Sequence, residues 1–393
     1  MAGTNPSQRS EALNGYRALA IMVVMLAHTR FGDAYPPWMR PFEPFLRGGV
    51  TAFMVLSGYL ITHLLLSEEA KRGKVDVLAF FGGQVVRFFA PTVPYLAVAL
   101  LVWGLPEAGF QWWPSLRILW ASPWTGDGFH GATALTGHLY SLAAQTQFCI
   151  WWPPLLMVIP PARRLLSVTL LMLAAATWRI LGRELAIAHN ETQQRTDYVF
   201  GSLMVGAWWA IAVTKGRMDW ILRLTRARLL PIFGGALLIL AFTRSPSAFV
   251  ELISPELRQA VAPWRQVPVV AVSIRVVLSL VSMLAFGCLA FLLHQGRPVR
   301  VAQVFAWPGI TWLGRISFSV YLWQNVFCFG VSNLKIGSVR LDDFPINMVA
   351  SVVCGYLSYR LLELPSLKFR SWVKQRIRSR NGTGDSSPSV TPT

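Results

Sequence analysis

The sequence predicts an all-α, polytopic membrane protein with about ten transmembrane helices and both termini in the cytoplasm. Composition is the first reason: of the 393 residues, 54% are hydrophobic and only 14% are charged, whereas soluble domains carry roughly 25% charged residues. The mean hydropathy is correspondingly positive, at +0.45. The second reason is a series of apolar stretches of near-spanning length, and the third is the placement of basic residues between them.

Ten apolar stretches have the length of a membrane span or come close to it. They fall at 15–32, 48–67, 91–106, 139–160, 164–181, 198–213, 229–243, 268–293, 312–331 and 345–363. Several are short or contain polar positions, which is typical of helices that face the interior of a bundle. We therefore expect a cytoplasmic segment at 1–12, one transmembrane domain at 13–370, and a cytoplasmic tail at 371–393 that is basic and then disordered.

The basic residues orient these stretches. The chain carries 36 Lys and Arg against 18 Asp and Glu, a formal charge of +18. Because no compact basic domain or nucleic-acid motif stands apart from the apolar stretches, the excess fits topology signals and anionic lipid, and we expect no nucleic-acid partner. With the N-terminus inside, the cytoplasmic segments collect Lys71, Arg72, Lys74 and Arg87, then Arg163 and Arg164, then Lys215, Arg217, Arg223, Arg226 and Arg228, then Arg297 and Arg300.

The first apolar stretch contains an arginine and a histidine, in GYRALAIMVVMLAHTRF (15–31). A charged side chain at the centre of a membrane costs roughly 2.5–3.5 kcal/mol on insertion scales, so such residues are candidates for function. Arg17 and His28 are eleven residues apart. This spacing is close to three helical turns, which places both residues on one face with an axial separation of about 16 Å.

Six further motifs follow in order along the chain. They are GGVTAFMVLSGYLI (48–61), FFGGQVVRFFAP (80–91), GHLYSLAAQTQFCIWWP (137–153), QRTDYVFGSLMVGA (194–207), LGRISFSVYLWQ (313–324) and SYRLLELPSLKFR (358–370). Together with the opening arginine and histidine, this series resembles the integral-membrane acyltransferase-3 family, whose bacterial members O-acylate surface polysaccharides, lipid-linked sugars and some secondary metabolites. The resemblance extends from about residue 13 to residue 370.

The sequence departs from the family's pattern at two places. Gly83 and Gln84 stand where the family usually has two arginines, which leaves Arg87. In the motif at 137–153, the family usually has a glutamate four residues after the serine. Here that position is Gln145, and the next residue is Thr146. Because a glutamine side chain neither ionises nor accepts a proton, a mechanism that needs a glutamate at this position does not carry over.

Acyl transfer to a hydroxyl needs a group that takes the hydroxyl proton or carries the acyl group, and a group that stabilises the oxyanion. We interpret His28 as the general base or acyl carrier, because imidazole exchanges protons near neutral pH. The alternative is a bundle histidine that hydrogen-bonds a neighbouring helix. We assign Arg17 to the same catalytic centre, where its guanidinium would hold the phosphates or pantetheine of the donor. The alternative for Arg17 is a side chain that snorkels to the interface.

Five further residues are candidates for substrate binding: Arg87, Ser141, Gln145, Arg195 and Asp197. Arg87 would contact the donor just before the third span, unless it only snorkels. Ser141 and Gln145 are four residues apart and share a helix face, where they either orient a substrate or make interhelical hydrogen bonds. Arg195 and Asp197 would pair, and Asp197 would replace the missing carboxylate if the fold brings it near His28.

The sequence therefore predicts an enzyme of the bacterial inner membrane that moves an acyl group to a hydroxyl of a surface polysaccharide or a lipid-linked sugar. The resemblance implies acyl-CoA, most simply acetyl-CoA, as the donor, and we expect membrane lipid as a further partner and no permanently bound cofactor. No metal is expected, because the sequence has no HExxH and no Cys/His cluster. Two alternatives stay open: a membrane transporter or exporter, and a family member with altered catalysis that binds a glycan.

Overall fold

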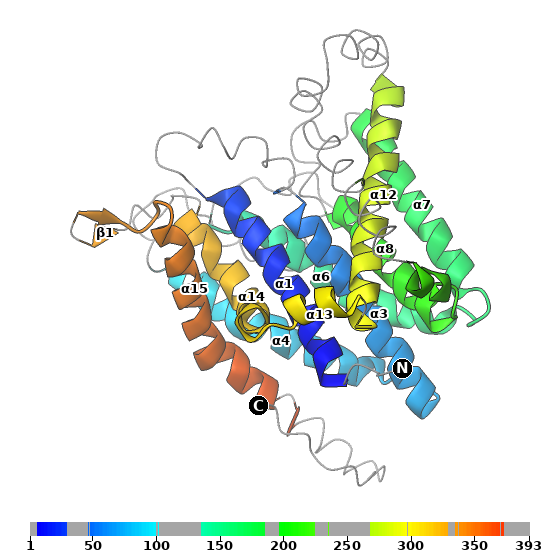
Figure 1. The fold of residues 1–393 in the computed structure, drawn as a ribbon, viewed down its shortest axis with the longest axis horizontal. Coiled ribbons are helices and arrows are strands. Elements are labelled where there is room, and N and C mark those ends of the chain that lie inside the picture. The colour runs from blue at the N-terminus through cyan, green and yellow to red at the C-terminus, as the bar shows by residue number, and fades with distance from the viewer. Residues whose placement is uncertain are drawn as a thin grey trace.

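A computed structural model of the chain describes residues 6–29, 48–99, 135–184, 196–224, 268–296, 298–328 and 338–369, with positions 46, 101, 235, 335–336 and 371–372. Within these ranges most residues are helical, and the helices form a bundle (Figure 1). A short hairpin pairs β1 (Lys335–Ile336) antiparallel with β2 (Val339–Arg340). The predicted all-α class is thus confirmed for the described part of the chain.

The bundle is built from long helices and one short one. They are α1 (Pro6–His28), α3 (Gly49–Arg72), α4 (Val77–Ala99), α6 (Tyr140–Val158), α7 (Arg164–Glu184), α8 (Thr196–Thr214), α12 (Pro268–His294), α13 (Val299–Phe305), α14 (Pro308–Cys328) and α15 (Ile346–Ser358). A 3-10 turn at Gly137–Leu139 leads into α6, and a π-helical turn at Tyr359–Glu363 follows α15. Helix α1 packs against α3, α12, α13 and α14, and Figure 1 shows it between α14 and α3.

Each predicted span other than 229–243 overlaps one of these helices within the described residues. The stretch 229–243 lies outside the described residues, apart from position 235. Among the described helices, Gly49–Arg72, Val77–Ala99 and Val276–His294 are long and apolar enough to cross a membrane. The total of about ten spans and the cytoplasmic position of both termini stay predictions.

One predicted helix boundary was wrong. The third span was expected at 91–106, but α4 begins at Val77 and contains Pro91 and Pro94 in its interior. Proline ends most soluble helices, but membrane helices tolerate it because neighbouring groups satisfy the backbone carbonyls that it leaves unpaired. Arg87 consequently lies within the helix and not in a segment before it. Helix α1 begins at Pro6 and so includes part of the segment 1–12, whose cytoplasmic position stays a prediction.

Glycines let α3 and α8 approach until their backbones touch. A Cβ atom added at Gly58 would overlap the carbonyl group of Leu203, and one added at Gly206 would overlap the carbonyl oxygen of Val55. Small residues allow this close approach in membrane bundles, where packing contributes much of the association energy. The pair of glycines therefore fixes the separation of the two helices.

We expect Gly58→Ala to destabilise the protein by about 1–3 kcal/mol, because the added methyl group forces α3 and α8 apart. The measurement is the thermal unfolding midpoint of the purified protein in detergent. Gly82→Ala is the matched control, since Gly82 is exposed on α4 and an added Cβ meets nothing within 4 Å. Equal unfolding midpoints for the two variants would contradict the close approach at Gly58.

Candidate active site

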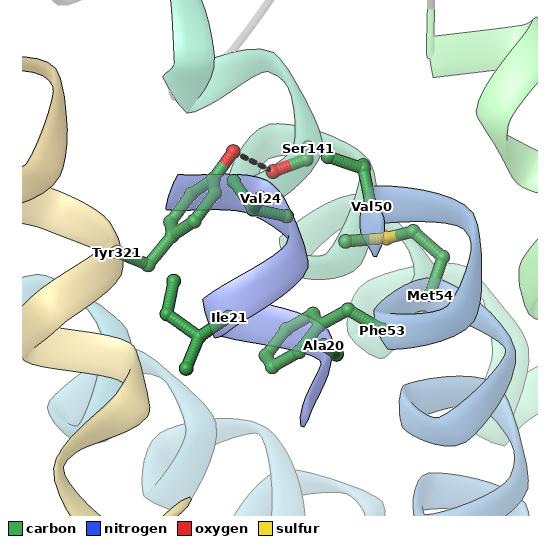
Figure 2. A pocket seen from close by; sticks show the side chains of 8 residues that line it. All are labelled: Ala20, Ile21, Val24, Val50, Phe53, Met54, Ser141 and Tyr321. Carbon is green, nitrogen blue, oxygen red and sulfur yellow. Dashed lines mark hydrogen bonds between the residues drawn. The ribbon is translucent and has the colours of Figure 1, made fainter. Parts of the chain in front are cut away.

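One face of α1 turns toward the bundle interior between Arg17 and His28. Ala20, Ile21 and Val24 follow Arg17 by three, four and seven residues, so they lie on the same face, and all three are buried. They line a narrow apolar cavity (Figure 2), and its other walls are Val50, Phe53, Met54, Ser141 and Tyr321. The cavity holds about one water molecule, so a larger group enters only when the surrounding side chains move.

His28 is the last residue of α1 and is hydrogen-bonded to α14. Its Nδ1 atom lies 3.1 Å from Oε1 of Gln324, and Nε2 of Gln324 donates to Oδ1 of Asn325 at 2.6 Å. Because Asn325 takes the amide nitrogen of Gln324, the amide oxygen faces His28 and accepts the proton of Nδ1. Neutral imidazole then carries its lone pair on Nε2, the atom suited to act as a base or an acyl carrier.

Ser141 belongs to a hydrogen-bond cluster that joins α6 to α14. The Tyr321 hydroxyl donates to the backbone carbonyl of His138 at 2.6 Å, and the Ser141 Oγ atom lies 2.6 Å from the Tyr321 oxygen. Figure 2 shows this pair beside the cavity. The Ser141 Oγ atom is also 3.3 Å from the His138 carbonyl oxygen. His138 interacts electrostatically with His28, so the cluster stands at the His28 end of the α1 face.

The other end of the α1 face carries a charge cluster of two arginines and a glutamate. Arg17 on α1 and Arg87 on α4 both interact electrostatically with the carboxylate of Glu363. Glu363 is only 3% exposed, and its Oε2 atom accepts a hydrogen bond from Ser319 at 2.7 Å. The Arg17 Nη1 atom also donates to Oδ1 of Asn14 at 3.4 Å. Arg17 and Arg87 thus share one buried carboxylate as an electrostatic partner, although neither forms a direct ion pair with it.

Glu363 was not among the residues that the sequence predicted for the site. The available signal was a carboxylate inside the last apolar stretch, 345–363, because an ionisable residue in a span is a functional candidate by default. Its partners could not be named, since Glu363 lies 346 positions from Arg17 along the chain.

The remaining predicted residues are Gln145, Arg195 and Asp197. Gln145 is 6% exposed and lies on α6, one turn after Ser141. Asp197 is the second residue of α8, but its side chain is not described, and Arg195 lies outside the described residues. That Asp197 replaces a carboxylate near His28 therefore stays a prediction.

The two ends of the α1 face differ in chemistry. The end with Arg17 and Arg87 suits an anionic group, because guanidinium groups bind phosphates through paired hydrogen bonds. The end with His28 supplies a nitrogen base, and an apolar cavity lies between the two. Among the described residues, no three His, Cys, Asp or Glu side chains gather as a metal site would require. The arrangement suits the passage of a small acyl group from an anionic carrier to an imidazole.

Comparisons with known proteins agree with this chemistry. A family model described as an acyltransferase domain matches residues 10–360. The "Peptidoglycan O-acetyltransferase OatA" of Listeria monocytogenes serovar 1/2a is 24% identical over 380 residues, which cover 91% of this chain and 56% of the relative. The "O-acetyltransferase OatA" of Staphylococcus aureus strain NCTC 8325 is 24% identical over 382 residues, 91% of this chain and 57% of the relative. The chain thus spans little more than half the length of these relatives. No solved structure matches it.

Proposed function

The chain belongs to the acyltransferase-3 family, and on this premise we propose that it is an O-acetyltransferase that uses acetyl-CoA to acetylate a hydroxyl group of a cell-surface glycan. Two relatives are named as O-acetyltransferases, one of them of peptidoglycan. We place the protein in the bacterial inner membrane, which it crosses several times. The acceptor is a surface polysaccharide or a lipid-linked sugar.

The α1 face is the observation that carries the proposal. Arg17 and Arg87 stand at its cytoplasmic end by the positive-inside rule, where they hold the phosphates or pantetheine of the donor. The acetyl thioester points along the face toward His28, about 16 Å further along the helix. The Nε2 atom of His28 attacks the thioester carbonyl, the C–S bond breaks, and the CoA thiolate leaves.

The cavity favours a short acyl group over a long one. Its walls between Arg17 and His28 are apolar side chains, among them Ile21, Val24 and Met54. An acetyl group requires only small rotations of these side chains, whereas each additional methylene must displace well-packed atoms. Acetyl-CoA is therefore the donor that we propose.

A second function rests on Gln145. A carboxamide at this position cannot take a proton, so a glycan-binding relative with altered catalysis is the alternative that this residue favours. Turnover separates the two functions: an enzyme releases CoA from acetyl-CoA in the presence of the glycan, and a binding protein retains the glycan without releasing CoA.

The proposed function is tested by the ester content of cell-wall glycan. Cells that express the chain are expected to release more acetate from this glycan under mild alkali than cells that lack it. Equal acetate would contradict acetylation of the cell wall. The release of CoA by isolated membranes would then distinguish a transferase with another acceptor from a protein without transferase activity.

A further inference from the structure

Three buried polar atoms near the His28 end of the α1 face lack a hydrogen-bond partner among the described residues. They are Nδ1 and Nε2 of His138 and Nε1 of Trp323. Tyr95 contacts both side chains in edge-on geometry: its ring centroid is 5.9 Å from that of His138 and 5.3 Å from that of Trp323. Buried polar atoms nearly always have hydrogen-bond partners. Three unpartnered atoms on side chains that contact or adjoin one tyrosine therefore indicate a polar ligand that would hydrogen-bond to them.

The hydrogen bonds that hold His138 in place involve its backbone and not its ring nitrogens. Tyr321 and Ser141 bond to the backbone carbonyl of His138, not to its imidazole. The Leu322 backbone lies near the ring, but its geometry does not complete a hydrogen bond. The His138 side chain is 4% exposed. An imidazole is thus held in place, with both nitrogens available to a bound molecule.

The position of this imidazole relates it to the proposed reaction. His138 interacts electrostatically with His28. Trp323 directly precedes Gln324, whose amide oxygen binds His28. The ring of His138 is therefore within electrostatic range of the histidine proposed to carry the acetyl group, at the end of the face opposite Arg17 and Arg87.

We propose that His138, Trp323 and Tyr95 form the acceptor subsite, with His138 as the catalytic residue that takes the proton of the acceptor hydroxyl. This inference rests on the proposed function. The ligand class is a sugar ring, because its hydroxyl groups complete His138 and the Trp323 N–H, while its apolar C–H face packs on the aromatic ring of Tyr95.

The transfer step balances with these groups. After the first step the acetyl group is bonded to Nε2 of His28, and the CoA thiolate has left. The acceptor oxygen attacks the acetyl carbonyl, the C–N bond to His28 breaks, and the hydroxyl proton passes to His138. Neutral His28 is restored, and the proton taken by His138 balances the thiolate, so the products are the ester and CoA thiol.

The experiment compares two acceptors with the purified full-length protein and acetyl-CoA. Peptidoglycan fragments offer hydroxyl groups, which need a base, and hydroxylamine offers a nitrogen nucleophile that attacks without prior loss of a proton. His138→Gln is expected to lower the rate of CoA release with the fragments by about 10²–10⁴-fold, the usual contribution of a general base. The rate with hydroxylamine should stay close to that of wild type.

A second variant and a control make the test independent of folding. Trp323→Phe removes the N–H donor together with the five-membered ring of the indole, and it is expected to raise KM for the fragments without changing the hydroxylamine rate. His63→Gln is the matched histidine control. Gly49 on α3 packs against Ala20 and Val24 of α1. His63 follows Gly49 by fourteen residues on the same helix, so His63 lies about 21 Å along α3 from the part that contacts Ala20 and Val24.

The outcomes separate this inference from the proposed function. If His138→Gln lowers the rates with both acceptors equally, or with neither, His138 is not the acceptor base and the inference fails. If the wild-type protein releases CoA with neither acceptor, the proposed acetyltransferase function itself fails, whatever the variants do.

Discussion

Replacing His28 by alanine is expected to lower the acetyl ester content of cell-wall glycan to that of cells without the chain. The substitution removes Nε2, the atom that would carry the acetyl group, and a histidine that acts only as a base already contributes about 10²–10⁴-fold. The measurement is the acetate that mild alkali releases from the glycan. Wild type and His28→Ala are compared at equal amounts of membrane-inserted protein, so that the difference reports activity per molecule.

Folding must be separated from activity in this variant. His28→Ala leaves Oε1 of Gln324 without the partner that it has at 3.1 Å, at a cost of roughly 1–3 kcal/mol for a buried unsatisfied group. The unfolding midpoint in detergent is therefore measured beside His63→Ala, which removes another bundle histidine. Wild-type ester content in His28→Ala would leave His28 with a structural role, as a bundle histidine that binds Gln324.

The sequence predicted those features that depend on local periodicity. The stretch 164–181, for example, corresponds to α7 at Arg164–Glu184, because a run of apolar residues bounded by arginines is visible without knowledge of the fold. The shared face of Arg17 and His28 follows from helical geometry alone, and the cavity lies against that face. The start of α4 was missed because a proline ends a helix in water but not in a bundle.

The contents of the site could not be predicted in the same way, because its groups meet only in the folded chain. Glu363, near the end of the described chain, interacts electrostatically with Arg17 and Arg87, and the imidazole of His138, in a turn before α6, interacts electrostatically with His28. No spacing rule joins residues so far apart. The sequence indicated Ser141 as a site residue, but its hydrogen bond to Tyr321 required the position of α14.

Replacing Glu363 by glutamine is expected to destabilise the protein by about 1–3 kcal/mol, because it removes the negative charge that offsets Arg17 and Arg87. Glutamine keeps the size of the side chain and accepts the hydrogen bond of Ser319, so the change isolates the negative charge that offsets Arg17 and Arg87. The measurement is the unfolding midpoint in one detergent. Glu68→Gln is the control, since its pair with Arg72 is partly exposed at 44% and 22% and is worth about 0.3–0.5 kcal/mol.

A double-mutant cycle decides whether the arginine is the cause of that loss. If Glu363 stabilises the fold by offsetting Arg17, the cost of Glu363→Gln falls by about 0.5–3 kcal/mol when Arg17→Gln is already present. If the unfolding free-energy costs of Glu363→Gln and Arg17→Gln simply add, the two side chains do not interact, and the proposed charge cluster is contradicted. Arg17 would in that case be a side chain that snorkels to the membrane interface, the alternative that its sequence position left open.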